Sequence, residues 1–151
     1  MLRPYTGPVQ LEPALEAFVR EARVARLATV DERGRPHVVP ICFVYDGGAV
    51  YSVLDAKPKR VPVRRLRRVR NLVANPDAQV LVDRWDEDWS RLAYVQLRGR
   101  ASLLEASPEQ AEAVRLLRAK YTQYAAMAID DQPVIKVEVE DAVVWGFDQT
   151  L

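Results

Sequence analysis

A cluster of basic residues is the part of this sequence whose residue types point most directly to chemistry. The segment from Lys57 to Arg70 contains eight lysines and arginines and no acidic residue, whereas the formal net charge of the whole chain is +1. Arginine and lysine side chains neutralise phosphate and direct hydrogen bonds to its oxygens. The segment therefore indicates a local anion site and not the broadly basic surface of a protein that coats nucleic acid.

The spacing within this segment suggests how an anion would be held. On a helix, Arg64, Arg68 and Asn71 would share one face, because they recur at i, i+4 and i+7. The apolar residues of the same segment would form a separate stripe, consisting of Val63, Leu66, Val69 and Val73. We expect the polar face to converge on one dianion, with Lys57 and Lys59 just upstream. A solvent-exposed basic helix face is the simpler alternative and fits the same spacing.

Few other side chains could act as acids, bases, nucleophiles or metal ligands. The chain has one histidine, His37, and one cysteine, Cys42, so neither an internal disulfide nor a zinc-type cluster is expected. An isolated histidine is more often structural than catalytic, and Cys42 is expected to be a small buried hydrophobe. An anion site combined with so few acid–base groups is best explained by a bound cofactor that supplies the reactivity.

Two tryptophans, Trp85 and Trp89, occur in an acidic segment between two predicted strands. We expect a ring ligand or a partner subunit to cover these indoles. The alternative is that they pack against the strands of their own chain. Stacking of single-stranded RNA on them is disfavoured, because they lie among acids and not among the cations.

The elements that must position these residues are mostly strands. Apolar alternation and turn signals predict six, at Val24–Val30, Pro36–Tyr45, Ala49–Leu54, Ala78–Asp83, Leu92–Leu104 and Val134–Val144. Helices are predicted over Glu12–Arg23, over the second half of the basic segment, and from a capping box at Ser107 to Tyr121. Strands joined by short turns, without βαβ alternation, favour an antiparallel barrel over a doubly wound sheet.

Two residues within these strands are expected to interrupt regular strand pairing. Pro40 cannot donate to a strand ladder, so we expect it at a sheet edge or a bulge, where a ligand can approach the backbone. Gly99 is expected to be the point at which the long strand Leu92–Leu104 bends.

Length and composition set the general class of the protein. With 151 residues, 49% of them hydrophobic and 28% charged, the chain is expected to form one globular domain over residues 1–151. No apolar run is long enough to span a bilayer and no secretory signal is visible, so we expect a cytoplasmic protein without a membrane partner. A Walker loop and a G-x-G-x-x-G motif are both absent.

The order of the motifs resembles the pyridoxamine-5'-phosphate-oxidase-like split-barrel family, especially an actinobacterial-type branch that uses FMN or the deazaflavin coenzyme F420. The likeness spans about Leu11 to Phe147 and rests on GRPHVVPICF, AVYSV, RNLVANP, AQVLVD and DEDWSRLAYVQLRGRASL. It implies a mainly β fold, a six-stranded antiparallel split barrel with flanking helices, that works as a homodimer. The residues typical of true pyridoxamine-phosphate oxidases for their vitamin substrate are missing, so oxidation of vitamin B6 is not implied.

The resemblance also implies a set of cofactor-binding residues. The second and third strands would offer backbone to the isoalloxazine ring, the basic loop and helix would hold the phosphate, and Trp89 would reach the partner's cofactor. The implied residues are Val39, Pro40, Ile41, Tyr51, Ser52, Val53, Lys57, Lys59, Arg65, Arg68, Asn71 and Trp89. Arginine at position 68 and a longer basic loop depart from the family's R-x-K-x-x-N-L pattern, which leaves the phosphate ligands open.

The function implied is that of an oxidoreductase, in which a flavin or deazaflavin exchanges a hydride with a small organic substrate. Lys57, Lys59, Arg60 and Arg65 supply cations beyond a phosphate pocket, which favours F420, with its anionic tail, over FMN. The alternative is a protein of the same fold that carries a cofactor or haem without turnover, although His37 is the only histidine that could ligate haem.

Overall fold

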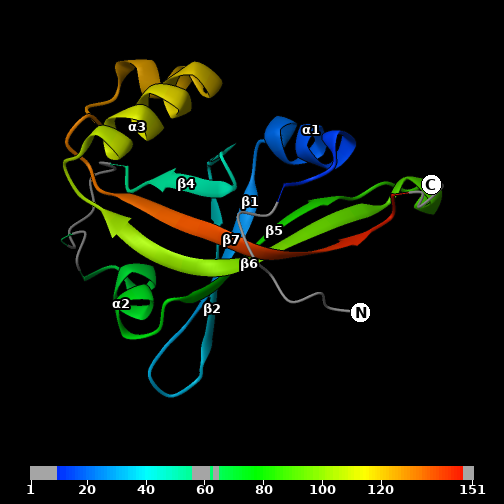
Figure 1. Ribbon diagram of the computed structural model, residues 1–151, viewed down its shortest axis with the longest axis horizontal. Coiled ribbons are helices and arrows are strands. Elements are labelled where there is room, and N and C mark those ends of the chain that lie inside the picture. Colours follow the sequence, from blue (N-terminus) through cyan, green and yellow to red (C-terminus); the bar gives the residue numbers. More distant parts are fainter. Residues whose placement is uncertain (1–9, 56–61, 63–64, 148–151) are drawn as a thin grey trace.

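Seven antiparallel strands form a single curled sheet in the computed structural model, which describes residues 10–55, 62 and 65–147 (Figure 1). The strands are β1 (Ala25–Val30), β2 (Pro36–Ile41), β3 (Val44–Asp46), β4 (Ala49–Val53), β5 (Asp77–Arg84), β6 (Ala93–Leu104) and β7 (Val134–Trp145). Their order in the sheet is β2-β1-β5-β6-β7-β4-β3. The prediction of a mainly antiparallel split barrel with flanking helices is thereby confirmed.

The number of strands differs from the prediction of six, because the expected strand Pro36–Tyr45 is two strands. β2 pairs with β1 as far as Ile41, and β3 pairs with β4 from Val44 onward, so the chain passes from one end of the sheet to the other at Cys42 and Phe43. The backbone groups of Phe43 are bonded by side chains instead of by a strand. Its N–H donates to the Tyr121 hydroxyl at 3.0 Å, and Lys120 Nζ donates to its carbonyl at 2.9 Å.

Three helices flank the sheet, α1 (Pro13–Glu21), α2 (Arg67–Ala74) and α3 (Pro108–Lys120). The 3-10 turn η2 (Trp89–Arg91) lies between β5 and β6, and η3 (Thr122–Ala126) follows α3. α3 packs against β3, β4 and β7, and α2 packs against β1 and β6. As predicted, Ser107 caps α3: its hydroxyl accepts a hydrogen bond from the N–H of Gln110 at 3.1 Å. None of the helices in the described ranges has the length and apolar character needed to cross a bilayer.

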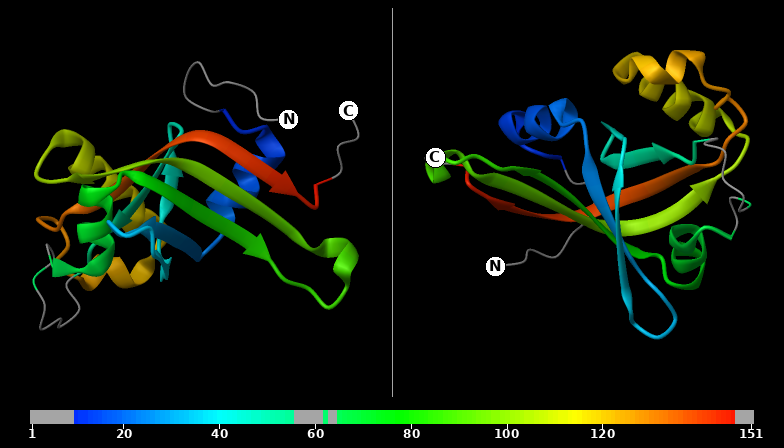
Figure 2. Two further views of the ribbon diagram at one scale, coloured as in Figure 1. Left: turned by 90° about the horizontal axis from the view of Figure 1, so that it is seen from below. Right: turned by 180° about the vertical axis from the view of Figure 1, so that it is seen from behind.

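The β1–β2 hairpin crosses the long strands β6 and β7 steeply, and its tip lies on the same side of them as α2 (Figures 1 and 2). Strands β5, β6 and β7 extend away from α2 and α3 as an arm that ends at η2 (Figures 1 and 2). Alternate residues of the strands, including Leu27, Val80 and Leu97, are fully buried in the barrel core. A second core lies under α3 and includes Leu117 and Ile129.

Gly99 is the point of irregularity that the sequence predicts in β6. The register between β6 and β7 shifts between Arg98 and Gly99, which is the signature of a β-bulge. A Cβ atom at position 99 would collide with the backbone carbonyl oxygen of Glu138, so the close approach of the two strands requires glycine.

Candidate functional site

The opening of the barrel exposes strand edges on both of its sides. β2 pairs only with β1 in the described sheet, and the pairing of β3 with β4 ends at Val44 and Tyr51. Ser52 and Val53 therefore continue β4 beyond the end of β3, where β7 is their only strand partner in the described sheet. Pro40 lies on β2, an edge strand, as predicted, and its missing N–H costs the sheet no inner ladder bond there.

A cavity of about 280 Å³ lies at this opening, and we call it the split cavity. Its lining residues are Val24, Pro40, Ile41, Cys42, Ser52, Val53, Asp55, Arg68 and Tyr124. It brings together five of the residues predicted for a cofactor site, which are Pro40, Ile41, Ser52, Val53 and Arg68. They come from two strands and one helix that are separated along the chain, so the convergence is a property of the fold.

Arg68 provides the positive charge of the split cavity. It lies in the first turn of α2 and is half-buried, and it forms no ion pair with any carboxylate in the described part of the chain. Burial lowers the pKa of its guanidinium, while the nearby Asp55 raises it. An arginine keeps its proton under such a shift. The split cavity thus combines strand backbone with a charged, directional donor that suits a phosphate.

Four residues that line the split cavity were not predicted as site residues: Val24, Cys42, Asp55 and Tyr124. Tyr124, from η3, is 5% exposed, and burial raises the pKa of its phenol, with the Cys42 sulfur beside it. The phenol therefore stays protonated at neutral pH. Cys42 is exposed, so the expectation of a buried hydrophobe is wrong. The reason is its place between β2 and β3, where the chain leaves the sheet and the side chain faces the cavity.

Local sequence signals point only weakly to these additional cavity residues. Cys42 directly follows the predicted site residue Ile41, and Asp55 follows the third predicted strand, so adjacency along the chain is the signal that points to them. Tyr124 had no such local signal, because η3 meets β4 only through the folding of α3 over the sheet.

Several predicted site residues lie elsewhere. Val39 points to the opposite side of β2 from Pro40 and packs against the barrel core. Tyr51 is buried beneath α3, where its hydroxyl donates to Glu109 Oε2 at 2.9 Å, and the hydrogen bonds of Glu109 to Lys136 and Tyr51 help lower the pKa of that carboxyl. Arg65 is exposed just before α2. Lys57 and Lys59 lie outside the described residues, as does Arg64.

The predicted helical face of α2 is corrected by the structure. Asn71 is 4% exposed and packs toward the barrel, whereas Val73, assigned to the apolar stripe, is 74% exposed. The buried apolar side chains of α2 are Val69 and Leu72, three residues apart. Asn71 tolerates burial because its Nδ2 donates to Thr29 Oγ1 at 3.1 Å. Arg68 and Asn71 line different cavities and do not converge on one point.

A second cavity of about 360 Å³ lies between α2 and the tip of the β1–β2 hairpin, and we call it the hairpin cavity. Its lining residues are Asp31, Glu32, Arg33, Arg35, Arg67, Arg70, Asn71 and Ala74. Asp31 accepts from the Nε of Arg35 at 2.8 Å and from Arg67 at 3.4 Å. Hydrogen bonds from the backbone and side chain of Arg35, and from the backbone of Arg33, lower the pKa of Asp31 to about 2. The cations of α2 are therefore divided between two cavities.

His37 lies on β2 near these cations. Burial, followed by the charges of Arg67 and Arg68, lowers the pKa of its imidazole, so the neutral form prevails at neutral pH. Its Nδ1 is buried and has no hydrogen-bond partner in the part of the chain that the structure describes. Within that same part, no cluster of three or more histidine, cysteine, aspartate or glutamate side chains could hold a metal ion.

Exposed aromatic rings gather on the arm formed by β5, β6 and β7. Trp85 is 67% exposed and Trp89 is 68% exposed, and both lie around η2 at the end of the arm. Tyr94 and Trp145 stack on each other across β6 and β7, with ring centroids 5.9 Å apart. Trp89 thus does not pack into its own barrel.

Comparison with known proteins agrees with this architecture. The family model described as "Pyridoxamine 5'-phosphate oxidase" matches residues 11–146. A search of curated proteins found no match. Among solved structures, HutZ, the heme storage protein from Vibrio cholerae, is similar at 21% identity and a TM-score of 0.70, over 92% of this chain and 97% of HutZ.

Two mycobacterial structures show the same fold. The conserved hypothetical protein Rv2991 from Mycobacterium tuberculosis is 15% identical, with a TM-score of 0.73, over 97% of this chain and 95% of that one. A heme binding protein from Mycobacterium smegmatis is 22% identical, with a TM-score of 0.65, and the match covers 93% of this chain but 57% of that protein. At these identities the similarity shows the fold alone.

Proposed function

Since the chain belongs to the pyridoxamine 5'-phosphate oxidase family, we propose that it is an oxidoreductase that uses a flavin or deazaflavin to exchange a hydride with a small organic substrate. The observation that carries this proposal is the split cavity, in which the strand backbone at Pro40, Ile41 and Ser52 lies beside the half-buried Arg68. A planar, polar ring and a phosphate are the groups that such a lining complements.

The residues of the split cavity have separable roles in this proposal. Arg68 binds the cofactor phosphate, because a charged fork without an ion-pair partner among the described carboxylates gains most from a dianion. The backbone of β2 and β4 orients the ring, and the buried Tyr124 phenol stays protonated and can donate a hydrogen bond. The bound cofactor supplies the hydride chemistry, and the protein supplies binding and orientation.

We propose coenzyme F420 as the cofactor, with FMN as the alternative. Support comes from the number of cations near α2 beyond Arg68, since Arg33, Arg35, Arg67 and Arg70 line the hairpin cavity. Two carboxylates, those of Asp31 and Glu32, line the same cavity, and Asp31 pairs with Arg35 and Arg67, so the four arginines still leave an excess of positive charge. An anionic tail would find complementary charge there, whereas FMN has no tail to use it.

We also propose that the protein is a homodimer whose sites are composite. The support is the set of exposed aromatic rings on the arm, among them Trp89, which is 68% exposed. An obligate two-fold interface of more than about 2,000 Å² would bury rings of this kind.

A carrier of haem or another cofactor without turnover is the second candidate. The observation that favours it is the neutral His37, whose Nδ1 has no partner among the described residues, because neutral imidazole is the form that ligates iron. The similarity to two haem proteins adds a reason to test it.

The deciding experiment is a titration of the purified apoprotein with F420, FMN and haemin, followed by absorbance and tryptophan fluorescence. We expect F420 to bind most tightly, and Arg68→Ala to weaken its binding by about 1.5 to 3 kcal/mol, the range for hydrogen bonds to charged groups. Arg115→Ala is the matched control, because Arg115 is exposed and pairs with Glu112 on α3. Tight binding of haemin alone would replace the redox proposal with the carrier. An unchanged F420 dissociation constant in Arg68→Ala would remove Arg68 from the site.

A further inference from the structure

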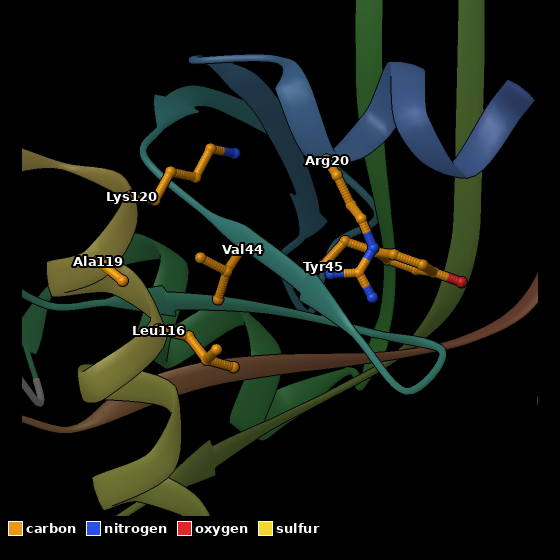
Figure 3. Close-up of a pocket in the computed structure, with 6 residues that line it drawn as sticks. All are labelled: Arg20, Val44, Tyr45, Leu116, Ala119 and Lys120. Carbon is orange, nitrogen blue, oxygen red and sulfur yellow. The ribbon is translucent and has the colours of Figure 1, made fainter. Parts of the chain in front are cut away.

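A third cavity, of about 290 Å³, lies between α1, β3 and α3, and we call it the α1–α3 pocket (Figure 3). It is lined by Arg20, Val44, Tyr45, Leu116, Ala119 and Lys120. None of these residues lines the split cavity, so the two cavities have separate linings.

The lining of the α1–α3 pocket is amphipathic. Val44, Leu116 and Ala119 give it an apolar wall from β3 and α3. Arg20 reaches in from α1 on one side of the β3 strand, and Lys120 lies on α3 on the other side (Figure 3). A ligand with a short apolar body and a charged end matches such a wall.

Lys120 is the side chain whose charge is least compensated. Its ammonium is half-buried, donates to the Phe43 carbonyl at 2.9 Å and lies 4.1 Å from the centroid of the Phe43 ring. No carboxylate in the described part of the chain forms an ion pair with it. The ammonium also lies 5.3 Å from the centroid of the Tyr121 ring. Of its three donors, only one meets an oxygen acceptor among the described residues, the Phe43 carbonyl, so a ligand carboxylate would replace a weaker ring contact.

The neighbours of Lys120 increase this imbalance. Burial, together with the positive charges of Arg23 and Arg20, lowers the pKa of Lys120 to about 8, against an opposing effect of Cys42. Arg23 donates to the backbone carbonyl of Lys120 at 2.6 Å. The hydroxyl of the adjacent Tyr121 donates to the backbone carbonyls of Arg23 and Phe43.

The nearby acids are committed to Arg20. Glu16 Oε1 lies 2.9 Å from Arg20 Nε, and Asp46 Oδ1 lies 3.6 Å from its terminal nitrogen. Arg20 is thus largely neutralised, and the excess positive charge is concentrated at the Lys120 end of the pocket.

We propose that the α1–α3 pocket binds a small organic carboxylate, with the carboxylate at Lys120 and the apolar body against Val44 and Leu116. A desolvated ammonium without a counter-ion would gain a charge-assisted hydrogen bond from an anionic ligand, which it lacks in the free protein. The volume of about 290 Å³ lies just below the usual range for ligand cavities, about 300 to 1,000 Å³, which limits the body to one ring or a short chain. This site is separate from the proposed cofactor site and does not depend on it.

The test is calorimetric titration of the cofactor-free protein with benzoate, with benzyl alcohol as the neutral probe of the same shape. We expect saturable benzoate binding, and binding by benzyl alcohol weaker by about tenfold or more, the usual scale for a lost charged hydrogen bond. Lys120→Met should weaken benzoate to the same degree, and Lys120→Arg should retain binding. Arg100→Met, which removes an exposed arginine of β6, should leave binding unchanged.

A second variant keeps the proposal testable if loss of the Lys120–Phe43 bond disturbs the fold. Leu116→Trp fills the apolar part of the pocket without removing charge, and it should abolish benzoate binding while thermal unfolding stays cooperative. Equal binding of benzoate and benzyl alcohol would overturn the proposal. Benzoate binding that survives in Leu116→Trp would also overturn it. So would a wild-type protein that does not bind benzoate. Because no flavin or haem is present, none of these results bears on the proposed redox function.

Discussion

Asn71 on α2 donates a hydrogen bond from Nδ2 to Oγ1 of Thr29 on β1 at 3.1 Å, and both side chains are almost completely buried. This bond fastens the arginine-bearing helix to the barrel wall. It fixes the rotation of α2, so that Arg68 faces the split cavity while Arg67 and Arg70 face the hairpin cavity. The relationship between the two residues therefore determines how the positive charge of the helix is distributed.

Removing the Asn71 side chain should destabilise the protein and weaken anion binding at Arg68 in the split cavity. Asn71→Ala leaves the Thr29 hydroxyl buried without its partner, which should lower the free energy of unfolding by about 1 to 3 kcal/mol. Urea denaturation measures the loss. In a cycle with Thr29→Val, the double variant should lose less than the sum of the two single variants, because both partners are then absent. Strict additivity would mean that the bond contributes nothing.

Modification of Cys42 should block the split cavity. The thiol is exposed and lines the cavity, so a maleimide attached to it would occupy the space proposed for the cofactor. We expect labelling of one site by mass spectrometry, loss of F420 and FMN binding in the labelled protein, and slower labelling when cofactor is already bound. Cys42→Ser treated in the same way is the control and should bind as before. Unchanged cofactor binding after complete labelling would exclude the split cavity as the site.

The carboxylate of Asp31 should make the stability of the hairpin depend on acid pH. Hydrogen bonds from the backbone and side chain of Arg35 and from the backbone of Arg33 lower the pKa of Asp31 from 3.8 to about 2 in the folded state. A lowered pKa stabilises the folded protein above the unfolded value, and this stabilisation is lost as the pH falls from about 4 to about 2.

Asp31→Asn provides the measurement. The variant should be less stable than the wild type at neutral pH, and the difference in unfolding free energy should shrink between about pH 4 and pH 2. Glu32→Gln, which removes the neighbouring exposed carboxylate of the same turn, controls for the loss of one negative charge. A difference that stays constant down to pH 2 would contradict the assignment.

The sheet was accessible from the sequence because its signals are local. Alternation in ARLATV and the proline in PHVVPI specify a half-buried strand and an edge strand, and both are found as β1 and β2. Gly99 could also be interpreted in advance, since an isolated glycine in a long strand usually marks a bulge. The break at Cys42 and Phe43 could not, because the run ICFVY is continuously apolar and is divided only by closure of the barrel.

The site was less accessible, since its residues depend on distant partners. Asn71 looks like a polar surface residue until Thr29, which is 42 positions away, accepts its hydrogen bond. Tyr124 reaches the split cavity only because α3 folds back over β4. The basic segment was identified, but its division between two cavities depends on the rotation of α2, which no spacing rule specifies.

Trp89 connects the proposed cofactor site to the proposed dimer. The ring is 68% exposed in the single chain, at the end of the arm, so its removal should change the unfolding free energy of the fold by less than about 0.5 kcal/mol. Because we propose that the ring covers the cofactor of the partner subunit, Trp89→Ala should also weaken cofactor binding by about 1 to 2 kcal/mol, through lost burial and aromatic contact. Fluorescence quenching on cofactor addition should also be smaller in the variant.

Trp85→Ala is the matched control, because Trp85 lies next to the same turn and is 67% exposed. Light scattering of the wild type should give about twice the chain mass of 17.1 kDa. A monomeric mass at micromolar concentration would contradict the composite site, because no second chain would then be present to receive Trp89. A dimer in which Trp89→Ala binds cofactor as tightly as the wild type would also contradict it, and would leave the ring as part of the subunit contact alone.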